Sequence, residues 1–242
     1  MRNPPTVHEA RIAEIFSSLQ GEGTHMGERH LFIRFEECHI HCEYCDELDK
    51  PARSMSLDEV VAAVCQLEKE EGPHTFVSLT GGEPLLYLNF LRPLLLRLKA
   101  QGFGIYLETN GILWQALEEI IGWCDIIAMD LKPASVTKER SFLAEHREFL
   151  KRCHGKEVFI KIILSREIDV REFQDLIELV KDHLPKTPVI LQPVSPATNE
   201  NQAEGHEDPQ LIELMLELQR MAVRVIPHVR VMPRLHRILK MR

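Results

Sequence analysis

The sequence lacks an apolar run long enough to cross a membrane. No stretch of its 242 residues approaches the roughly 18 apolar residues that a membrane-spanning helix requires. Residues 1–16 carry charges where a secretory signal peptide has an apolar run. Internal repeats and low-complexity segments are missing as well. We therefore expect a cytoplasmic protein with no membrane partner.

An excess of positive charge is also missing. The chain has 29 Lys and Arg against 37 Asp and Glu, which gives a formal net charge of -8. A nucleic-acid surface needs Lys and Arg clustered along one face, so we expect no nucleic-acid partner. An anionic small substrate remains compatible with this composition, because a local basic pocket does not need a basic protein.

What is present is an alternation of short β-forming runs with longer amphipathic runs. The β-forming runs span residues 29–35, 75–80, 103–110, 125–132, 157–164, 188–194 and 228–233. The amphipathic runs span residues 56–72, with Ser56 as the N-cap, and 87–102, 112–123, 137–152, 169–183 and 209–221. This order predicts an α/β fold with mostly parallel strands. Seven strands fall short of the eight of a closed barrel, so we predict one domain over residues 1–242 built as a partial (β/α) barrel.

Polar residues gather where these predicted strands end, at residues 80–83, 108–110 and 130–132 and at Gln192. The carboxyl ends of parallel strands carry the site in βα folds. The polar stretch 193–210 is long for a connection, and its length is typical of a functional loop.

A cysteine-rich loop follows the first predicted strand. The run CHIHCEYCD places thiols at Cys38, Cys42 and Cys45. Closely spaced thiolates are the ligands of iron–sulfur clusters, and a cubane held only by protein needs four. Three ligands leave one iron open to a substrate or cofactor.

A zinc site and plain core packing are the alternatives to a cluster in this loop, and both stay open. His39 or His41 would complete a tetrahedral zinc site with the three cysteines, although zinc spacings usually contain two separated CxxC pairs. The three cysteines would otherwise be buried core residues that happen to lie together. Core packing is the interpretation that we favour for the isolated cysteines, which are Cys65, Cys124 and Cys153.

The cysteine spacing, followed by TGGEP at residues 80–84, resembles the radical S-adenosylmethionine (SAM) superfamily. A narrower resemblance extends over most of the chain. EIFSSLQGEGTHMGERHLFIRF, CDELDK, SLTGGEPLL, ETNG, DLKPAS, LQPVSP and RVMPRLHRILK are similar to segments of the 7-carboxy-7-deazaguanine synthase family. The resemblance implies a lyase of queuosine and 7-deazapurine biosynthesis that converts 6-carboxy-5,6,7,8-tetrahydropterin to 7-carboxy-7-deazaguanine with loss of ammonia.

The resemblance also implies cofactors and partners. These are a [4Fe–4S] cluster, S-adenosylmethionine, Mg²⁺, a flavodoxin-like electron donor and a second copy of the chain in a homodimer. Residues 14–35 are implied to be a substrate-binding segment and residues 36–50 the cluster loop.

Site residues follow from the same resemblance. The implied cluster ligands are Cys38, Cys42 and Cys45. The implied SAM contacts are Tyr44, Asp46, Gly82, Glu83, Asp130, Leu131, Lys132 and Gln192. The implied pterin contacts are Leu19, Gln20, Gly21, Glu22, Arg34, Thr80 and His236.

Each polar member of this set also has an ordinary structural interpretation. Arg34 would lie on the solvent face of its strand, and Gln20 and Glu22 would be polar residues of a loop. Lys132 would be a surface lysine, and His236 would belong to a solvated basic tail. The position of each side chain in the folded protein decides between a structural and a functional role.

The sequence departs from the family pattern in and beside the cysteine loop. Glu37 replaces a glycine before the first cysteine, and His39 and His41 replace an asparagine and a basic residue. Glu47 stands where a Thr or Ser is implied to bind magnesium. A carboxylate is a competent ligand for a hard cation, so Glu47 is our candidate magnesium ligand. It would equally repel a substrate carboxylate and so favour another substrate.

Two rival functions therefore stay open. One is a related radical SAM enzyme that acts on another heterocycle or activates a partner enzyme. The other, from a different class, is a structural zinc protein or an iron–sulfur electron carrier.

Overall fold

The computed structural model describes residues 9–45, 51–194 and 208–241. Within them a single nine-stranded sheet runs in the order β3-β1-β2-β4-β5-β6-β7-β8-β9. Its strands are β1 (Glu9–Leu19), β2 (Arg29–Phe35), β3 (Arg53–Ser56), β4 (Phe76–Gly81), β5 (Gly104–Thr109), β6 (Ile126–Leu131), β7 (Glu157–Leu164), β8 (Val189–Pro193) and β9 (Val229–Val231). The edge strands β3 and β9 do not pair with each other, so the barrel is partial and open, as predicted.

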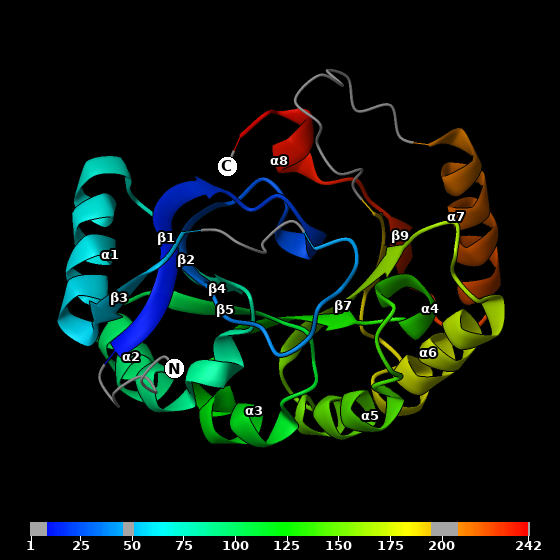
Figure 1. Cartoon of the computed structure of the whole chain (residues 1–242), viewed down its shortest axis with the longest axis horizontal. Coiled ribbons are helices and arrows are strands. Elements are labelled where there is room, and N and C mark those ends of the chain that lie inside the picture. The colour runs from blue at the N-terminus through cyan, green and yellow to red at the C-terminus, as the bar shows by residue number, and fades with distance from the viewer. Residues whose placement is uncertain (1–8, 46–50, 195–207, 242) are drawn as a thin grey trace.

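Most of the helices line the outer, convex face of the curved sheet (Figure 1). The α-helices are α1 (Leu57–Glu71), α2 (Leu88–Ala100), α3 (Trp114–Ile120), α4 (Ala134–Thr137), α5 (Leu143–Arg152), α6 (Val170–His183), α7 (Pro209–Ala222) and α8 (Leu235–Ile238). Short 3₁₀ turns are η1 (Gly23–His25), η2 (Pro84–Tyr87) and η3 (Ile121–Trp123). Among the helices of the described residues, none is long and apolar enough to span a membrane.

The seven strands predicted from the sequence are the seven parallel strands of the sheet, β2 and β4 to β9. The prediction was wrong in missing β1 and β3, which form an antiparallel edge beside β2. The register of β1 shifts between Ile12 and Glu14, which breaks the two-residue period that identifies a strand. In β3 only Met55 is buried, so its four residues carry no visible pattern.

The predicted helices are present, but the one expected over residues 112–123 is α3 followed by η3, and α8 was missed. Ser56 caps α1 as predicted, because its hydroxyl accepts from the backbone N–H of Glu59 and the Glu59 carboxylate accepts from the Ser56 N–H. The single helix expected over residues 137–152 is two helices, α4 and α5. Lys138 has a φ of 64°, a left-handed conformation that ends α4.

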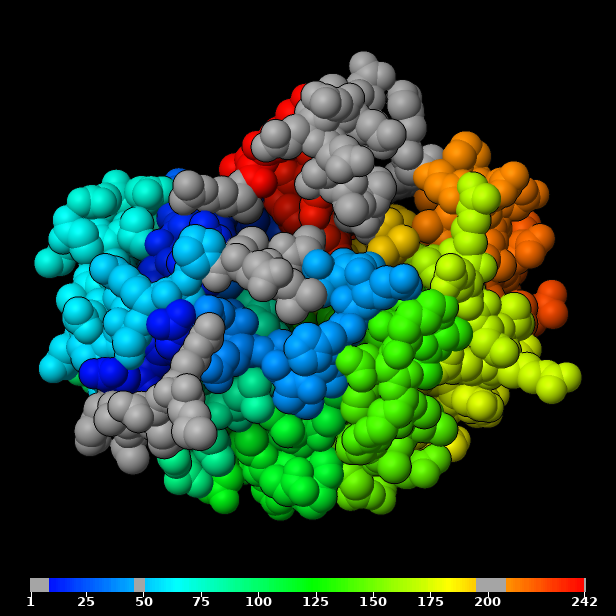
Figure 2. Space-filling model, viewed as in Figure 1, coloured from blue at the N-terminus to red at the C-terminus, as the bar shows by residue number. Residues whose placement is uncertain are grey.

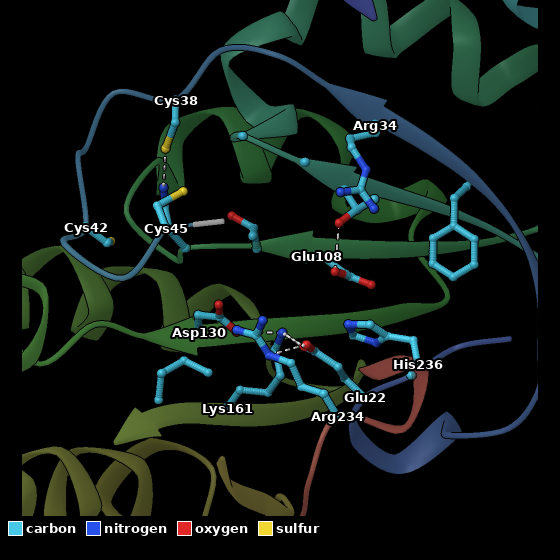
Figure 3. A pocket seen from close by; sticks show the side chains of 18 of the residues that line it. Glu22, Arg34, Cys38, Cys42, Cys45, Glu108, Asp130, Lys161, Arg234 and His236 are labelled. Carbon is cyan, nitrogen blue, oxygen red and sulfur yellow. Dashed lines mark hydrogen bonds and ion pairs between the residues drawn. The ribbon is translucent and has the colours of Figure 1, made fainter. Parts of the chain in front are cut away.

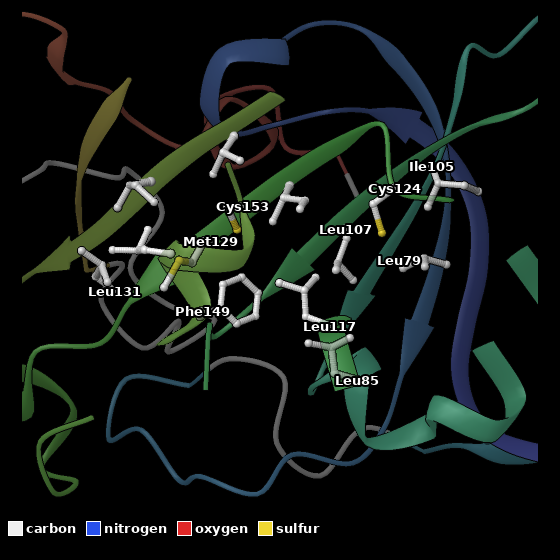
Figure 4. Packing of buried hydrophobic residues seen from close by; sticks show 14 of the residues in the cluster. Leu79, Leu85, Ile105, Leu107, Leu117, Cys124, Met129, Leu131, Phe149 and Cys153 are labelled. Atoms are coloured by element: carbon white, nitrogen blue, oxygen red, sulfur yellow. The ribbon is translucent and has the colours of Figure 1, made fainter. Parts of the chain in front are cut away.

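Side chains on the parallel strands alternate between two environments. Outward residues such as Leu79, Leu107 and Met129 pack with Leu117 of α3 and Phe149 of α5 in the main core (Figure 4). Inward apolar residues such as Tyr106 and Phe159 form a second cluster inside the barrel. Inward positions nearer the carboxyl ends of the strands are polar, and their side chains line the candidate site.

We predict that the main core carries much of the stability. Leu117→Ala removes a fully buried side chain and should lower the free energy of unfolding by about 2–5 kcal/mol. Leu96→Ala is the matched control, because Leu96 is 54% exposed and its loss should cost less than about 0.5 kcal/mol. Chemical denaturation measures both variants. Equal losses for the two would contradict this assignment of the core.

Candidate active site

One pocket opens at the carboxyl ends of the parallel strands, and segments far apart in the sequence line it. Its lining side chains come from the end of β1 and the loop after it, the cysteine loop, β2, β4, β5, β6, β7 and the C-terminal segment before and within α8. In the space-filling view the cysteine loop lies in the middle of the face toward the viewer, and the C-terminal segment lies above it (Figure 2). The pocket thus spans the sheet from β1 to β7.

The cysteine loop forms one end of this pocket. Cys38, Cys42 and Cys45 all line it, and none is in a disulfide. Burial raises the pKa of the Cys38 and Cys42 thiols. In Figure 3 the three cysteines lie together at one side of the pocket, away from Glu22 and His236.

Two glycines at the end of β4, Gly81 and Gly82, fix the start of the cysteine loop. Gly81 has a φ of 107°, which L-residues with a side chain rarely adopt. A Cβ on Gly82 would lie 2.1 Å from the carbonyl oxygen of Glu37. The backbone N–H of Gly82 donates to Phe35 O at 2.8 Å, and that of Glu83 donates to Glu37 O at 2.7 Å. The TGGEP run therefore holds the backbone from which Cys38 projects.

Glu83 is fully buried and does not line the pocket. Its carboxylate accepts from Thr109 Oγ1 at 2.9 Å, from the Asn110 N–H at 2.8 Å and from the Leu85 N–H at 3.1 Å. Burial raises the pKa of Glu83 to about 7. The residue joins the end of β4 to the end of β5 and so supports Asn110, whose amide nitrogen lies 3.9 Å from Cys38 Sγ.

A chain of charged side chains crosses the floor of the pocket (Figure 3). Lys161 Nζ lies 2.6 Å from Glu22 Oε2 and 3.1 Å from Asp130 Oδ1. Lys132 Nζ donates to Asp130 Oδ2 at 2.8 Å. Arg234 Nε lies 3.2 Å from Glu22 Oε1. Two carboxylates are therefore held between three cations.

These contacts fix the ionisation of the chain of charges. Burial opposes the charge on Glu22 and on Asp130, but the neighbouring cations outweigh it and hold both pKa values below their ordinary range. Burial likewise opposes the charges on Lys132 and Lys161, and the carboxylates around them raise both pKa values. All four groups are charged at neutral pH.

Glu108 is a third carboxyl group on the pocket wall. It accepts from Gln20 Nε2 at 3.0 Å and from Thr80 Oγ1 at 2.8 Å. Burial raises the pKa of Glu108, whereas neighbouring cations lower the pKa of Asp130. Of these two pocket carboxyls, Glu108 is therefore the more easily protonated. The Gln20 Oε1 atom accepts from the Glu22 N–H at 3.0 Å, which links Glu108 to the loop after β1.

The C-terminal segment closes the far end of the pocket. The Leu235 N–H donates to Gly21 O at 2.9 Å. A Cβ on Gly21 would lie 2.0 Å from His236 Nδ1, so a glycine is needed for the two segments to meet. Arg234 and His236 both line the pocket as a result.

Most residues that the sequence analysis assigned to the site do line this pocket. They are Leu19, Gln20, Gly21, Glu22, Arg34, Cys38, Cys42, Tyr44, Cys45, Thr80, Gly82, Asp130, Lys132 and His236. Lys132 is no surface lysine, because its side chain is 11% exposed and paired with Asp130. His39 and His41 are exposed and do not line the pocket.

Three assigned residues stand behind the pocket wall. Glu83 is one, with its carboxylate turned toward the end of β5. Leu131 points outward into the main core, and Gln192 is buried and donates to Glu22 Oε1 at 3.1 Å. Asp46 and Glu47 lie outside the described residues.

Sequence reasoning missed several pocket residues. They are Lys161 and Arg234, together with Glu108 and Asn110, which the sequence marks only as parts of a strand end. A signal for two of them was available. Glu108 and Lys161 follow Tyr106 and Phe159 by two positions on their strands, and so share the inward face with them.

Known proteins resemble this chain over nearly its whole length. Residues 32–195 match the family model described as the Radical SAM superfamily. The 7-carboxy-7-deazaguanine synthase of Geobacter sulfurreducens is 35% identical over 95% of this chain and 97% of its own. The protein of the same name from Methanopyrus kandleri is 31% identical over 94% of this chain and 92% of its own.

Solved structures share the fold. QueE from Escherichia coli superposes with a TM-score of 0.59 at 20% identity, covering 93% of this chain and 94% of that one. Streptococcus suis SuiB bound to S-adenosylmethionine superposes with a TM-score of 0.58 at 16% identity, covering 82% and 48%. The extent of the family match and the near-complete coverage at 35% identity assign the chain: it belongs to the radical SAM superfamily and, within it, to the 7-carboxy-7-deazaguanine synthase family.

Proposed function

We propose that this chain is a lyase that converts 6-carboxy-5,6,7,8-tetrahydropterin to 7-carboxy-7-deazaguanine with loss of ammonia. The observation that carries the proposal is 35% and 31% identity to two synthases of that name over nearly the whole of both chains. The pocket supports it, because three thiols stand at one end and a hydrogen-bonding wall of carboxyl and amide groups stands at the other.

The donor set fits a [4Fe–4S] cluster. Cys38, Cys42 and Cys45 are free thiols on one loop, and all three face one pocket. Among the described residues, no three His, Cys, Asp or Glu side chains are grouped to hold a single metal ion. Each thiolate of a cubane binds a different iron, and three closely spaced thiols on one loop suit such a cluster. These three cysteines would hold the cluster and leave its fourth iron for the amino and carboxylate groups of S-adenosylmethionine.

When bound, the cluster and S-adenosylmethionine would together supply the radical chemistry that acts at C6 of the pterin. The chain's own part is binding, orientation and exclusion of water. Tyr44, Gly82, Asp130 and Lys132 line the pocket beside the cysteines and would contact S-adenosylmethionine. We assign Asp46 the same role from the sequence. Leu131 would contact S-adenosylmethionine only through its main chain, because its side chain packs in the main core.

Pterin recognition falls to the opposite end of the pocket. The ring edge of a pterin presents amide and amine N–H groups, which would donate hydrogen bonds to the carboxylates of Glu22 and Glu108. The side chains of Gln20 and Thr80 fix Glu108. Leu19 and Gly21 would flank the ring, and His236 would close over it. Gln192 would act through Glu22, to which it donates.

Arg34 would bind the substrate carboxylate. It lies on the pocket wall with its Nε 3.4 Å from Glu14 Oε2 and its guanidinium carbon 5.4 Å from the centre of the Phe16 ring. A planar guanidinium matches a carboxylate with two parallel hydrogen bonds. Binding of the substrate carboxylate at Arg34 is compatible with hydrogen bonds from the ring edge to Glu22 and Glu108.

We further propose a magnesium ion on the substrate carboxylate, with Glu47 as a ligand from this chain. A flavodoxin-like protein would deliver the electron. We also propose a homodimer and a cytoplasmic site of action, where the cluster thiols stay reduced.

Anaerobic turnover tests the substrate. Enzyme reconstituted with iron and sulfide should convert 6-carboxy-tetrahydropterin to 7-carboxy-7-deazaguanine when given S-adenosylmethionine and a reductant, with product followed by mass spectrometry. S-adenosylmethionine cleavage measured in the same sample is the internal control. Cleavage without any deazaguanine product would reject this substrate and favour another heterocycle or an activase.

Magnesium should raise the rate. Chelation of Mg²⁺ should lower kcat/KM by about tenfold or more, because the ion would polarise and orient the substrate carboxylate. Glu47→Thr should keep the Mg²⁺ requirement and change the Mg²⁺ concentration at half-maximal rate. An unaltered Mg²⁺ dependence in this variant means that Glu47 is not a ligand.

Iron analysis tests the cluster ligands. Reconstituted protein should contain about four irons per chain. Cys42→Ser should lose most of this iron, because a serine hydroxyl is a poor ligand for a soft site. Cys65→Ser should retain it, because Cys65 packs against the main core from α1. Stoichiometric zinc in place of iron, or full iron in Cys42→Ser, contradicts the assignment.

The role of Arg34 is tested by the conservative change Arg34→Lys. Loss of a two-pronged charged contact of about 1.5–3 kcal/mol should raise KM for the pterin roughly 10- to 100-fold. The KM for S-adenosylmethionine should hardly change. Arg29→Lys, an exposed position at the start of the same strand, serves as the control. A normal pterin KM in Arg34→Lys rules out this contact.

A further inference from the structure

Lys161 is the buried cation of the pocket that no sequence motif identified. It lies on the inward face of β7, directly opposite Asp130 of β6 in the strand register. Its side chain is 7% exposed. Its ammonium group contacts one carboxylate from the loop after β1 and another from β6, so it joins the two ends of the pocket.

Lys161 holds the two carboxylates differently. Its Nζ donates to Glu22 Oε2 at 2.6 Å, whereas Asp130 Oδ1, 3.1 Å away, accepts no hydrogen bond from the described residues. Each carboxylate also has a cation on its other oxygen, Lys132 on Asp130 Oδ2 and Arg234 on Glu22 Oε1. A buried carboxylate oxygen that loses a charged partner bears a large desolvation cost. Loss of Lys161 should therefore remove a hydrogen bond from Glu22 and none from Asp130.

Strand β7, which carries Lys161, also supports the backbone of the segment that carries Glu22. A Cβ on Gly23 would lie 2.2 Å from Phe159, so η1 rests directly on that ring. His25 Nε2 lies 3.1 Å from Glu157 Oε1. Three alternate residues of β7, at positions 157, 159 and 161, thus contact three nearly consecutive residues of the loop after β1. Lys161 is the member of this series that reaches the pocket.

We propose that Lys161 is a positioning residue that fixes the Glu22 carboxylate for recognition of the pterin ring and so sets the affinity for the pterin rather than for S-adenosylmethionine. The assignment of Glu22 to the pterin rests on the proposed function. The other titratable groups near Glu22 include Arg234 and His236 from the C-terminal segment, Glu108 from β5 and Asp130 from β6. Arg234 Nε lies 3.2 Å from Oε1, and Lys161 Nζ lies 2.6 Å from Oε2.

Binding measurements on the reconstituted enzyme test this proposal. Lys161→Met keeps the length of the side chain and removes its charge. We expect the Kd for 6-carboxy-tetrahydropterin to rise at least tenfold, and the Kd for S-adenosylmethionine to change less than threefold, by anaerobic calorimetry. Lys161→Arg should bring the pterin Kd back to within threefold of the wild-type value. Lys156→Met, just before β7 and outside the pocket, is the matched control and should bind both ligands normally.

Two outcomes overturn the proposal. Unchanged pterin binding in Lys161→Met shows that Glu22 does not need this partner. Equal losses for both ligands, without recovery in Lys161→Arg, show a general collapse of the pocket and no positioning role.

A second readout needs no substrate. Infrared titration, with the Glu22 band identified by its loss in Glu22→Gln, should give an apparent pKa for Glu22 at least one unit higher in Lys161→Met than in the wild type. If the wild-type enzyme binds S-adenosylmethionine but no pterin, the proposed substrate is wrong. The Glu22 titration then decides the role of Lys161 by itself, and an unshifted pKa overturns it.

Discussion

The two-residue alternation of side chains on the parallel strands is the constraint on which this structure depends. It directs one set of residues outward, where Leu79, Leu107 and Met129 meet the helices. It directs the other set inward, where Tyr106 and Phe159 close the barrel interior. Glu108 and Lys161 stand two positions further along the same strands, so the pattern that builds the core also delivers charges to the pocket.

Those charges are costly to bury, and the structure balances them in pairs. Glu22 and Asp130 share Lys161, while Arg234 and Lys132 each neutralise one of the two carboxylates. A buried network of this kind contributes little net stability, because desolvation offsets most of the attraction between its members. The network instead holds hydrogen-bond donors and acceptors in a fixed arrangement inside a protein with a negative net charge. The proposed ligands, a cofactor with amino and carboxylate groups beside a substrate with a carboxylate, would need such an arrangement.

Much of this architecture was predictable from the sequence, and the failures have physical causes. The parallel strands have strong β-forming runs with loops at regular intervals, so all seven were found. β1 escaped because its register shift breaks the alternation, and β3 because it buries a single side chain. The cysteine loop was identified because three thiols within eight residues are rare by chance.

The charged floor of the pocket was predictable only in part. Asp130 and Lys132 belong to a local motif, DLKPAS, but Lys161 and Arg234 are single cations in ordinary surroundings. They become site residues only because the fold brings β7 and the C-terminal segment against Glu22. Glu83 could not be placed from its motif alone. The motif marks it as a cofactor contact, and in the fold its carboxylate accepts hydrogen bonds from Thr109, Asn110 and Leu85 behind the pocket wall.

The central claim is that three cysteines hold a four-iron cluster whose fourth iron is open to S-adenosylmethionine. Pulsed electron–nuclear resonance on the anaerobic, reduced enzyme tests it most directly, with S-adenosylmethionine labelled with ¹⁵N at the amino group and ¹⁷O at the carboxylate. We predict strong hyperfine coupling of both labels to the cluster. A four-iron cluster that shows coupling to neither label, or reconstituted protein that forms no such cluster, would contradict the claim.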